Sequence, residues 1–134
     1  EHELNWFKRI SSLSEKKVSD FEICRNSLDI LHEKDLLTPL VIDELFKSKQ
    51  SIFVVMDEDD IEVLGVVKMT IIGEIGIDSK RVRTVMDRDF RIIRGDKNAL
   101  EAFEKMVKNG DKFAIVKNRK GEFSGILNVE DFLR

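Results

Sequence analysis

The sequence has few of the residues on which disulfide-linked, zinc-binding or membrane-spanning proteins depend. It contains one cysteine, Cys24, so no intrachain disulfide can form. Its two histidines, His2 and His32, stand apart with no cysteine nearby, which argues against a zinc cluster. The apolar runs are only a few residues long, far short of a membrane span, and no signal-peptide pattern is present.

Neither sign of charge dominates the chain. The formal net charge is −3, and Lys and Arg are interleaved with Asp and Glu, so the sequence lacks the basic footprint of a nucleic-acid-binding protein. With 134 residues and 42% hydrophobic content, the chain suits one compact domain or two interlocked half-domains. It begins at Glu1 rather than Met and stops within a helix-like pattern, so we expect it to be part of a longer protein.

What the chain does have is an internal repeat. Residues 52–55, an acidic turn and residues 63–67 recur as residues 113–116, a charged turn and residues 123–127. Each copy carries a glycine at the same place, Gly65 or Gly125, and follows a helix-like stretch. A repeated unit too small to bury its own core is expected to fold as a pseudo-twofold pair, with a ligand site at the seam.

Local signals predict the same order of elements in each copy. Thr38 followed by Pro39 predicts a helix start, and a second helix is expected from Asn98 to Gly110. Short extended pieces are expected at 18–21, 28–31 and 90–93, strands at 52–56, 63–67, 113–116 and 123–127, a brief helix or a linker at 69–72, and a last helix from about residue 128. The order β-α-β-β-α, used twice, predicts an α/β (α+β) fold. The predicted domains are a helical or linker segment at 1–17, unit 18–72, a linker at 73–81 and unit 82–134.

The second copy resembles the CBS domain, named after cystathionine β-synthase, along nearly its whole length. Residues 85–90, VMDRDF, resemble the family's opening VMTRDV, and residues 125–133, GILNVEDFL, resemble its GIVTxxDLL. The first copy resembles the family less well, but it shares the helix, the strands and the glycine. The resemblance implies a tandem CBS pair.

The pair also resembles those of hemolysin-like magnesium/cobalt-efflux membrane proteins. This similarity rests on Val18-Ser19-Asp20 with Arg25 downstream, on the acidic turn before Gly65, and on residues 113–116 with residues 129–131. The sequence departs from the first CBS motif at Glu22 and Cys24, where Met and Pro are usual.

The resemblance implies an adenosine-nucleotide site in the cleft between the units. Asp131 stands at the family's ribose-binding position, and Asn128 replaces the usual Thr or Ser. Lys112 stands where a phosphate-contacting Arg is common, and Arg91 can also reach the cleft. The expected adenine walls are Ile92, Ile93 and Ala114. The competing interpretation is that Asp131 only favours its helix N-terminus and that both cations are solvated.

The first copy is expected to have lost this chemistry. Lys68 takes the place of the Thr, Ile71 that of the Asp, and Ser51 that of Lys112. An isoleucine cannot accept a hydrogen bond from a ribose hydroxyl.

No catalytic or metal site is expected. Cys24 and His32 have no orienting acid, so a buried thiol and a surface imidazole are the simpler interpretation. The acidic turn at 57–60 lacks the spacing of a calcium loop, which favours a solvated turn.

The resemblance therefore predicts a regulatory module rather than an enzyme. It would bind AMP, ADP, ATP or S-adenosylmethionine, require no cofactor, and control an attached domain outside this chain. The alternative is a ligand-free dimerisation module, such as the cytosolic part of a metal-ion transporter, with Ile71, Ile72, Phe132 and Leu133 near its interface. Either way we expect a homodimer in the cytoplasm.

Overall fold

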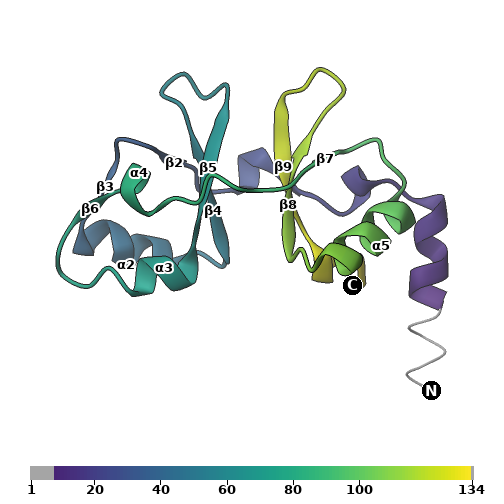
Figure 1. Cartoon of the computed structure of the whole chain (residues 1–134), viewed down its shortest axis with the longest axis horizontal. Helices are drawn as coiled ribbons and strands as arrows, with labels where there is room; N and C mark the ends of the chain where they lie inside the picture. The colour runs from purple at the N-terminus through teal and green to yellow at the C-terminus, as the bar shows by residue number, and fades with distance from the viewer. Residues whose placement is uncertain (1–7, 134) are drawn as a thin grey trace. The chain divides into compact units, whose positions relative to one another are not determined.

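The computed structural model describes residues 8–133, which form two compact units that each combine helices with a sheet (Figure 1). Within the described residues, unit 1 comprises 8–26 and 91–133, and unit 2 comprises 27–90. The predicted α+β class is confirmed.

Unit 1 is built on a four-stranded sheet in the order β1-β9-β8-β7. The strands are β1 (Ile23–Cys24), β7 (Ile92–Arg94), β8 (Phe113–Lys117) and β9 (Phe123–Asn128). Strand β8 runs antiparallel to β9 and parallel to β7, and β1 runs antiparallel to β9. The helical elements are residues 8–12, η1 (Leu13–Glu15), η2 (Val18–Asp20), α5 (Ala99–Asn109) and η4 (Val129–Leu133), and η3 (Arg25–Ser27) follows β1.

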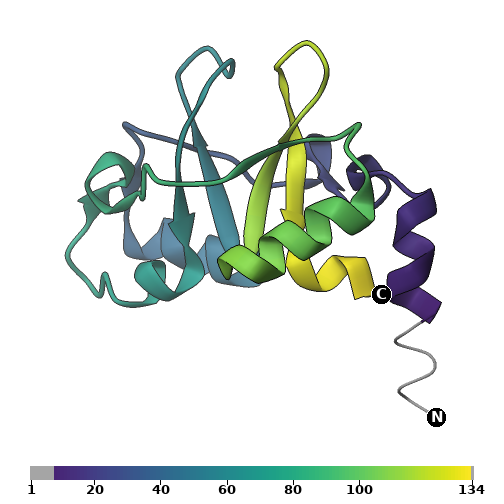
Figure 2. The same ribbon diagram turned by 45° about the vertical axis from the view of Figure 1, so that its right-hand side comes forward.

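Helix α5 begins and ends where the sequence predicts. The Asn98 side-chain oxygen accepts a hydrogen bond from the Glu101 N–H at 3.1 Å, and Gly110 ends the helix with a left-handed φ of 72°. Helix α5 lies against the sheet of its own unit (Figure 2), and its apolar side chains belong to the core there. This core joins Ala102 and Met106 to Ala114 and Leu127 of the strands.

Phe132 closes the core of unit 1. It is 1% exposed, and its ring lies between those of Phe21 and Phe103, with centroid distances of 5.2 and 5.5 Å. Tilted and edge-on aromatic pairs of this kind add to the area that the rings bury. The last turn of the chain, η4, is thereby tied to the core of unit 1.

Unit 2 repeats the arrangement with a three-stranded main sheet and a separate two-stranded sheet. Its sheet has the order β2-β4-β5, from β2 (Leu31–His32), β4 (Ile52–Met56) and β5 (Val63–Lys68), and β3 (Leu36–Leu37) pairs with β6 (Lys80–Arg81). Its helices are α2 (Pro39–Lys47), α3 (Met69–Gly73) and α4 (Val82–Val85). The Thr38 hydroxyl accepts a hydrogen bond from the Val41 N–H at 3.2 Å, which confirms the predicted start of α2.

The compact units do not coincide with the sequence repeats 18–72 and 82–134. The opening segment of each repeat lies with the strands of the other, because Ile23 pairs with Ile126 of β9 and Asp87 exchanges two backbone hydrogen bonds with Val66 of β5. Part of the expected linker at 73–81 forms strand β6. The boundaries 18–72 and 82–134 therefore remain a prediction about the duplicated sequence. The two compact units reflect the pairing of each opening segment with the strands of the other repeat.

Several short elements differ from the predictions. Residues 18–21 were expected to be extended, but Val18–Asp20 is a 3-10 turn, closed by a hydrogen bond from the Lys17 N–H to the Asp20 carboxylate at 2.9 Å. Only Leu31 of the extended piece 28–31 lies in a strand, and the last helix is the 3-10 turn η4. Over only four residues, an alternation of apolar and polar side chains does not distinguish a strand from a turn that buries one side chain.

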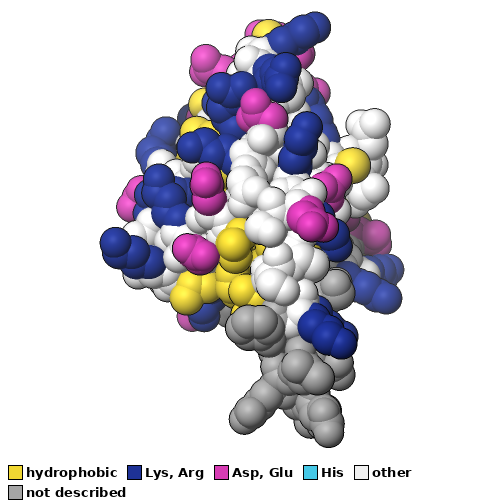
Figure 3. Space-filling model, turned by 90° about the vertical axis from the view of Figure 1, so that its right-hand side faces the viewer, with side chains coloured by type: hydrophobic (Ala, Val, Ile, Leu, Met, Phe, Trp, Pro, Cys, Tyr) yellow, Lys and Arg dark blue, Asp and Glu magenta, His cyan; other side chains and the backbone are white. Residues whose placement is uncertain are grey.

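Residues 8–15, within the expected N-terminal segment 1–17, are helical, and residues 1–7 lie outside the described part. On the face of the molecule in Figure 3, Lys and Arg side chains lie among Asp and Glu. This face therefore shows the interleaved charge of the sequence.

Candidate functional site

The polar residues predicted from the sequence gather at one end of the sheet of unit 1. The start of β8 and the end of β9 meet there, because Phe113 pairs with Asn128 and the Val129 N–H donates to the Lys112 carbonyl at 2.8 Å. The strand β7 starts at the same end, since the Ile115 N–H donates to the Arg91 carbonyl at 2.8 Å. The fold thus brings Arg91, Lys112 and Asn128 onto neighbouring strand ends.

Asp131 lies next to Asn128 and is largely removed from water. Its side chain is 8% exposed, and the Asn128 amide donates to its carboxylate at 3.3 Å. A buried carboxylate is expensive unless polar groups satisfy it, so this contact is part of what allows Asp131 to sit there. The amide of Asn128, which replaces the Thr or Ser usual in the family, thus donates to Asp131 in this structure.

Asp111 belongs to the same cluster and was not predicted. Its carboxylate accepts a hydrogen bond from Arg91 Nε at 2.8 Å, and the two side chains are 21% and 44% exposed, respectively. The guanidinium group has further N–H groups that can face a ligand while Nε is held. The sequence signal for Asp111 was its position directly before Lys112, just ahead of the segment that forms β8.

The three apolar residues expected to contact the adenine ring differ in how far they are exposed. Ile92 is 47% exposed on β7, while its neighbour Ile93 is half-buried against the core of unit 1. Ala114 has no exposed surface and packs among the core residues under α5. Among these three, Ile92 is therefore the side chain that a ligand can reach most readily, and the Ala114 side chain is unavailable in this conformation.

Unit 2 has the same backbone frame with different side chains. The Met69 N–H donates to the Ser51 carbonyl at 2.9 Å, as Val129 does to Lys112 in unit 1. Lys68 then takes the place of Asn128, and Ile71 that of Asp131. The frame is repeated, whereas the carboxylate is present only in unit 1.

The ion pair of unit 1 is also absent from the matching place in unit 2. The Asp29 N–H donates to the Gln50 side-chain oxygen at 2.6 Å, and the Gln50 amide donates to the Asp29 carbonyl at 3.3 Å. A neutral side chain holding the backbone thus replaces the Arg91–Asp111 pair. The Arg91–Asp111 pair is therefore specific to unit 1, whereas the cation at the matching end of unit 2 is Lys68, in the place of Asn128.

Cys24 belongs to unit 1 and His32 to unit 2. Residues 8–133 contain no group of three or more His, Cys, Asp or Glu side chains placed to hold a metal ion. The same part of the chain contains no helix with the length and apolar character needed to cross a membrane.

The apolar residues suggested for a dimer interface are largely used within the units. Ile72 and Phe132 are each 1% exposed and belong to the cores of unit 2 and unit 1. Ile71 and Leu133 are half-buried. The first two side chains are therefore unavailable to a second copy in this conformation.

Comparison with known proteins agrees with the resemblance. Residues 82–134 match the family model of the CBS domain. No curated protein matches the chain.

Solved structures match nearly the whole chain in fold. The CBS domain of the bacterial CNNM/CorC family Mg2+ transporter in complex with ATP has a TM-score of 0.83 at 15% identity, over 99% of this chain and 95% of that one. A hemolysin-like protein containing a CBS domain from Oenococcus oeni has a TM-score of 0.77 at 21% identity, over 94% and 93%. CBSX2 in complex with AMP has a TM-score of 0.72 at 18% identity, over 89% and 94%.

Residues 82–134 are thus a CBS domain, and the chain has the fold of CBS-domain proteins. The recognition made from the VMDRDF and GILNVEDFL segments is confirmed. The ligand residues and the cleft between the units stay predictions.

Proposed function

We propose that this CBS-domain chain is a regulatory module that binds an adenosine nucleotide at the strand ends of unit 1 and controls an attached domain. The observation that carries the proposal is the convergence of Arg91, Lys112, Asn128 and Asp131 on one end of one sheet. Two solved structures with the same fold contain ATP and AMP, respectively.

Each group has a role that fits one part of a nucleotide. The Asp131 carboxylate accepts hydrogen bonds from the ribose hydroxyls, and Arg91 and Lys112 offer positive charge to the phosphates. The exposed side of Ile92 offers apolar surface to the base. The remaining adenine contacts predicted for Ile93 and Ala114 require a change in their burial.

The proposed site is single because only unit 1 has these groups. In unit 2, Ile71 cannot accept a ribose hydroxyl, and Gln50 with Asp29 supplies no cation. The regulatory signal would therefore arise in one half of a structurally repeated module.

Calorimetric titration of the chain with AMP, ADP, ATP and S-adenosylmethionine tests the proposal. S-adenosylmethionine shares the nucleoside but has no phosphate, so it separates ribose recognition from phosphate recognition. We expect one nucleotide bound per chain and a loss of binding in Asp131→Ala. Because Asp131 is buried, circular dichroism must show that the variant is folded, and the exposed Lys112→Ala serves as a second variant.

A matched control is Lys108→Ala, which removes a charge from the exposed end of α5. It is expected to leave nucleotide affinity unchanged. No heat with any of the four ligands would overturn the proposal, as would equal binding by the wild type and by folded Asp131→Ala.

The attached domain, the cytoplasmic location and the homodimer are further parts of the proposal. They rest on the similarity in fold to the CBS domains of transporters and of a hemolysin-like protein. Sedimentation at several concentrations, with and without AMP, tests the dimer.

A further inference from the structure

Both units fasten the tip of their central hairpin to the end of the neighbouring strand, but with different chemistry. In unit 1, Asp96 accepts hydrogen bonds from Arg94 at 2.9 Å and from Arg119 of the β8–β9 turn at 3.3 Å. In unit 2, Lys34 forms an ion pair with Glu58 of the β4–β5 turn at 3.0 Å. In unit 1 the acidic residue follows the strand and the basic residue lies in the hairpin turn. In unit 2 the basic residue follows the strand and the acidic residue lies in the turn, at the corresponding positions.

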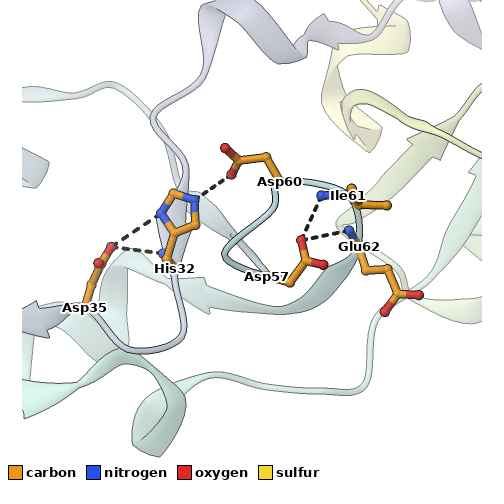
Figure 4. A network of polar contacts seen from close by, with 6 residues as sticks. All are labelled: His32, Asp35, Asp57, Asp60, Ile61 and Glu62. Atoms are coloured by element: carbon orange, nitrogen blue, oxygen red, sulfur yellow. Dashed lines mark hydrogen bonds and ion pairs between the residues drawn. The ribbon is translucent and has the colours of Figure 1, made fainter.

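Unit 2 has a second fastening that contains a histidine. His32, the last residue of β2, takes the place of Arg94, since His32 pairs with Met56 and Arg94 with Lys117 in equivalent registers. Its Nε2 bonds the Asp60 carboxylate at 2.5 Å, and its Nδ1 lies 3.7 Å from Asp35 (Figure 4). The imidazole therefore lies between two carboxylates from different segments.

Asp60 is held in the geometry that this contact needs. Its φ of 57° is left-handed, a conformation that Asp tolerates better than most side chains. Asp57 closes the same turn by accepting hydrogen bonds from the N–H groups of Ile61 at 2.7 Å and Glu62 at 3.1 Å (Figure 4). The turn thus presents the Asp60 carboxylate to His32.

We propose that the His32–Asp60 contact is a pH-dependent latch that fastens the β4–β5 hairpin tip of unit 2 when His32 is protonated and loosens it when His32 is neutral. With both nitrogens protonated, the ring donates to Asp60 and carries a positive charge opposite both carboxylates. The neutral ring keeps one N–H and loses the charge attraction. The corresponding contacts of the unit 1 hairpin tip join Asp96 to Arg94 and Arg119 and include no histidine.

The surroundings of His32 favour its protonated form. The charged groups of the adjoining segments are Glu33, Lys34 and Asp35 after β2, Asp57, Glu58, Asp60 and Glu62 of the turn, and Arg81 and Arg83 near the β2–β3 loop. The hydrogen bond to Asp60 raises the pKa of His32 above its ordinary value of 6.5, partial burial opposes this, and the charges of Asp60 and Asp35 add to the rise. The cation Lys34 is itself paired with Glu58.

The direction of the pH effect follows from the raised pKa. A histidine whose folded pKa lies above its unfolded value stabilises the folded form fully at pH values below the unfolded value. That contribution is lost as the pH rises from about 6.5 through the folded pKa of His32. The latch is therefore closed in mildly acidic solution and open in alkaline solution.

Nuclear magnetic resonance of the 134-residue chain tests the latch without any ligand. The pKa of His32 is followed through its ring carbons, with His32→Gln identifying its signals against those of His2. We expect a pKa above 6.5 in the wild type and a fall of the His32 pKa in Asp60→Asn, which keeps a side chain suited to left-handed φ. Asp96→Asn is the matched control and leaves the His32 pKa unchanged.

The mobility of the tip provides the second readout. Nitrogen relaxation at residues 57–62 is expected to show greater motion at pH 8.5 than at pH 5.5, with no such change at residues 118–122 or in His32→Gln. A His32 pKa at or below 6.5, a pKa unaffected by Asp60→Asn, or a tip equally mobile at both pH values would overturn the proposal.

Discussion

Gly125 of β9 lies so close to the backbone of Ile23 in β1 that a side chain at this position would overlap the Ile23 carbonyl oxygen. Gly65 of β5 has the same relationship to Asp87, whose carbonyl oxygen would lie 2.7 Å from an added Cβ. These two glycines occupy the same place in each sequence repeat. Each allows the opening segment of the other repeat to pair with its strand.

The first prediction concerns Gly125→Ala. An added methyl would meet the Ile23 backbone and lie 2.6 Å from the Glu22 carboxylate, so β1 must shift away from β9. We expect a loss of about 1–3 kcal/mol in the free energy of unfolding, the usual cost of overpacking. Chemical denaturation measures it.

Gly73→Ala is the matched control, because its added Cβ would meet only the Phe46 ring at 4.0 Å. We expect no loss of stability from this change. Equal stability of Gly125→Ala and the wild type would show that the close approach of β1 and β9 does not constrain the fold.

The second prediction concerns Phe132, which lies between two aromatic rings in the core of unit 1. Phe132→Ala should cost about 3–5 kcal/mol through the lost contacts and the cavity left behind. Val107→Ala, at a position 58% exposed on α5, should stay within about 0.5 kcal/mol of the wild type. Similar unfolding midpoints for the two variants would contradict the assignment of Phe132 to the core.

The third prediction concerns the charge beside the proposed nucleotide site. Asp111→Asn removes a carboxylate from Arg91, so it should tighten binding of ATP more than binding of AMP, because ATP carries more negative charge. Calorimetry gives the ratio of the two affinities. Asp43→Asn, on the exposed surface of α2, should leave that ratio unchanged, and an unchanged ratio in Asp111→Asn would contradict a phosphate position beside Arg91.

The fourth prediction concerns pH and the hairpin tip of unit 1. Partial desolvation raises the pKa of Asp96, but the positive charge of Arg94 and the hydrogen bond from Arg119 outweigh it, so the pKa lies below the ordinary 3.8. The stabilisation is present above pH 3.8 and is lost as the pH falls through the folded pKa. Asp96→Asn should be slightly less stable than the wild type at pH 7, and the difference should shrink at pH 3.

Thermal unfolding of both proteins across this range checks the sign. A difference that grows on acidification would contradict it. The effect is small because exposed ion pairs contribute little, and it runs opposite to that of the His32 latch.

Much of the fold was predictable because its signals are local. Thr38 with Pro39, and Asn98 with Gly110, mark helix ends by side-chain and backbone chemistry that needs no distant partner. The exchange of the opening segments was not predictable in this way. It depends on pairing between Ile23 and Ile126, which lie far apart in the sequence.

The candidate site was predictable to the same degree. The resemblance to the family's GIVTxxDLL segment singled out Asp131 and Asn128, and the structure places the two side chains in contact. The ion pair of Arg91 with Asp111 and the burial of Ala114 depend on strand register and on the position of α5, which the sequence alone does not specify.

We propose one nucleotide site in the repeated frame, at the strand ends of unit 1. The most direct test is an amide chemical-shift titration with AMP and ATP that compares Arg91, Lys112 and Val129 with their counterparts Asp29, Ser51 and Met69. We expect saturable shifts for the first set and none for the second. Equal shifts in both sets, shifts only in the second, or no shifts at all would contradict the account.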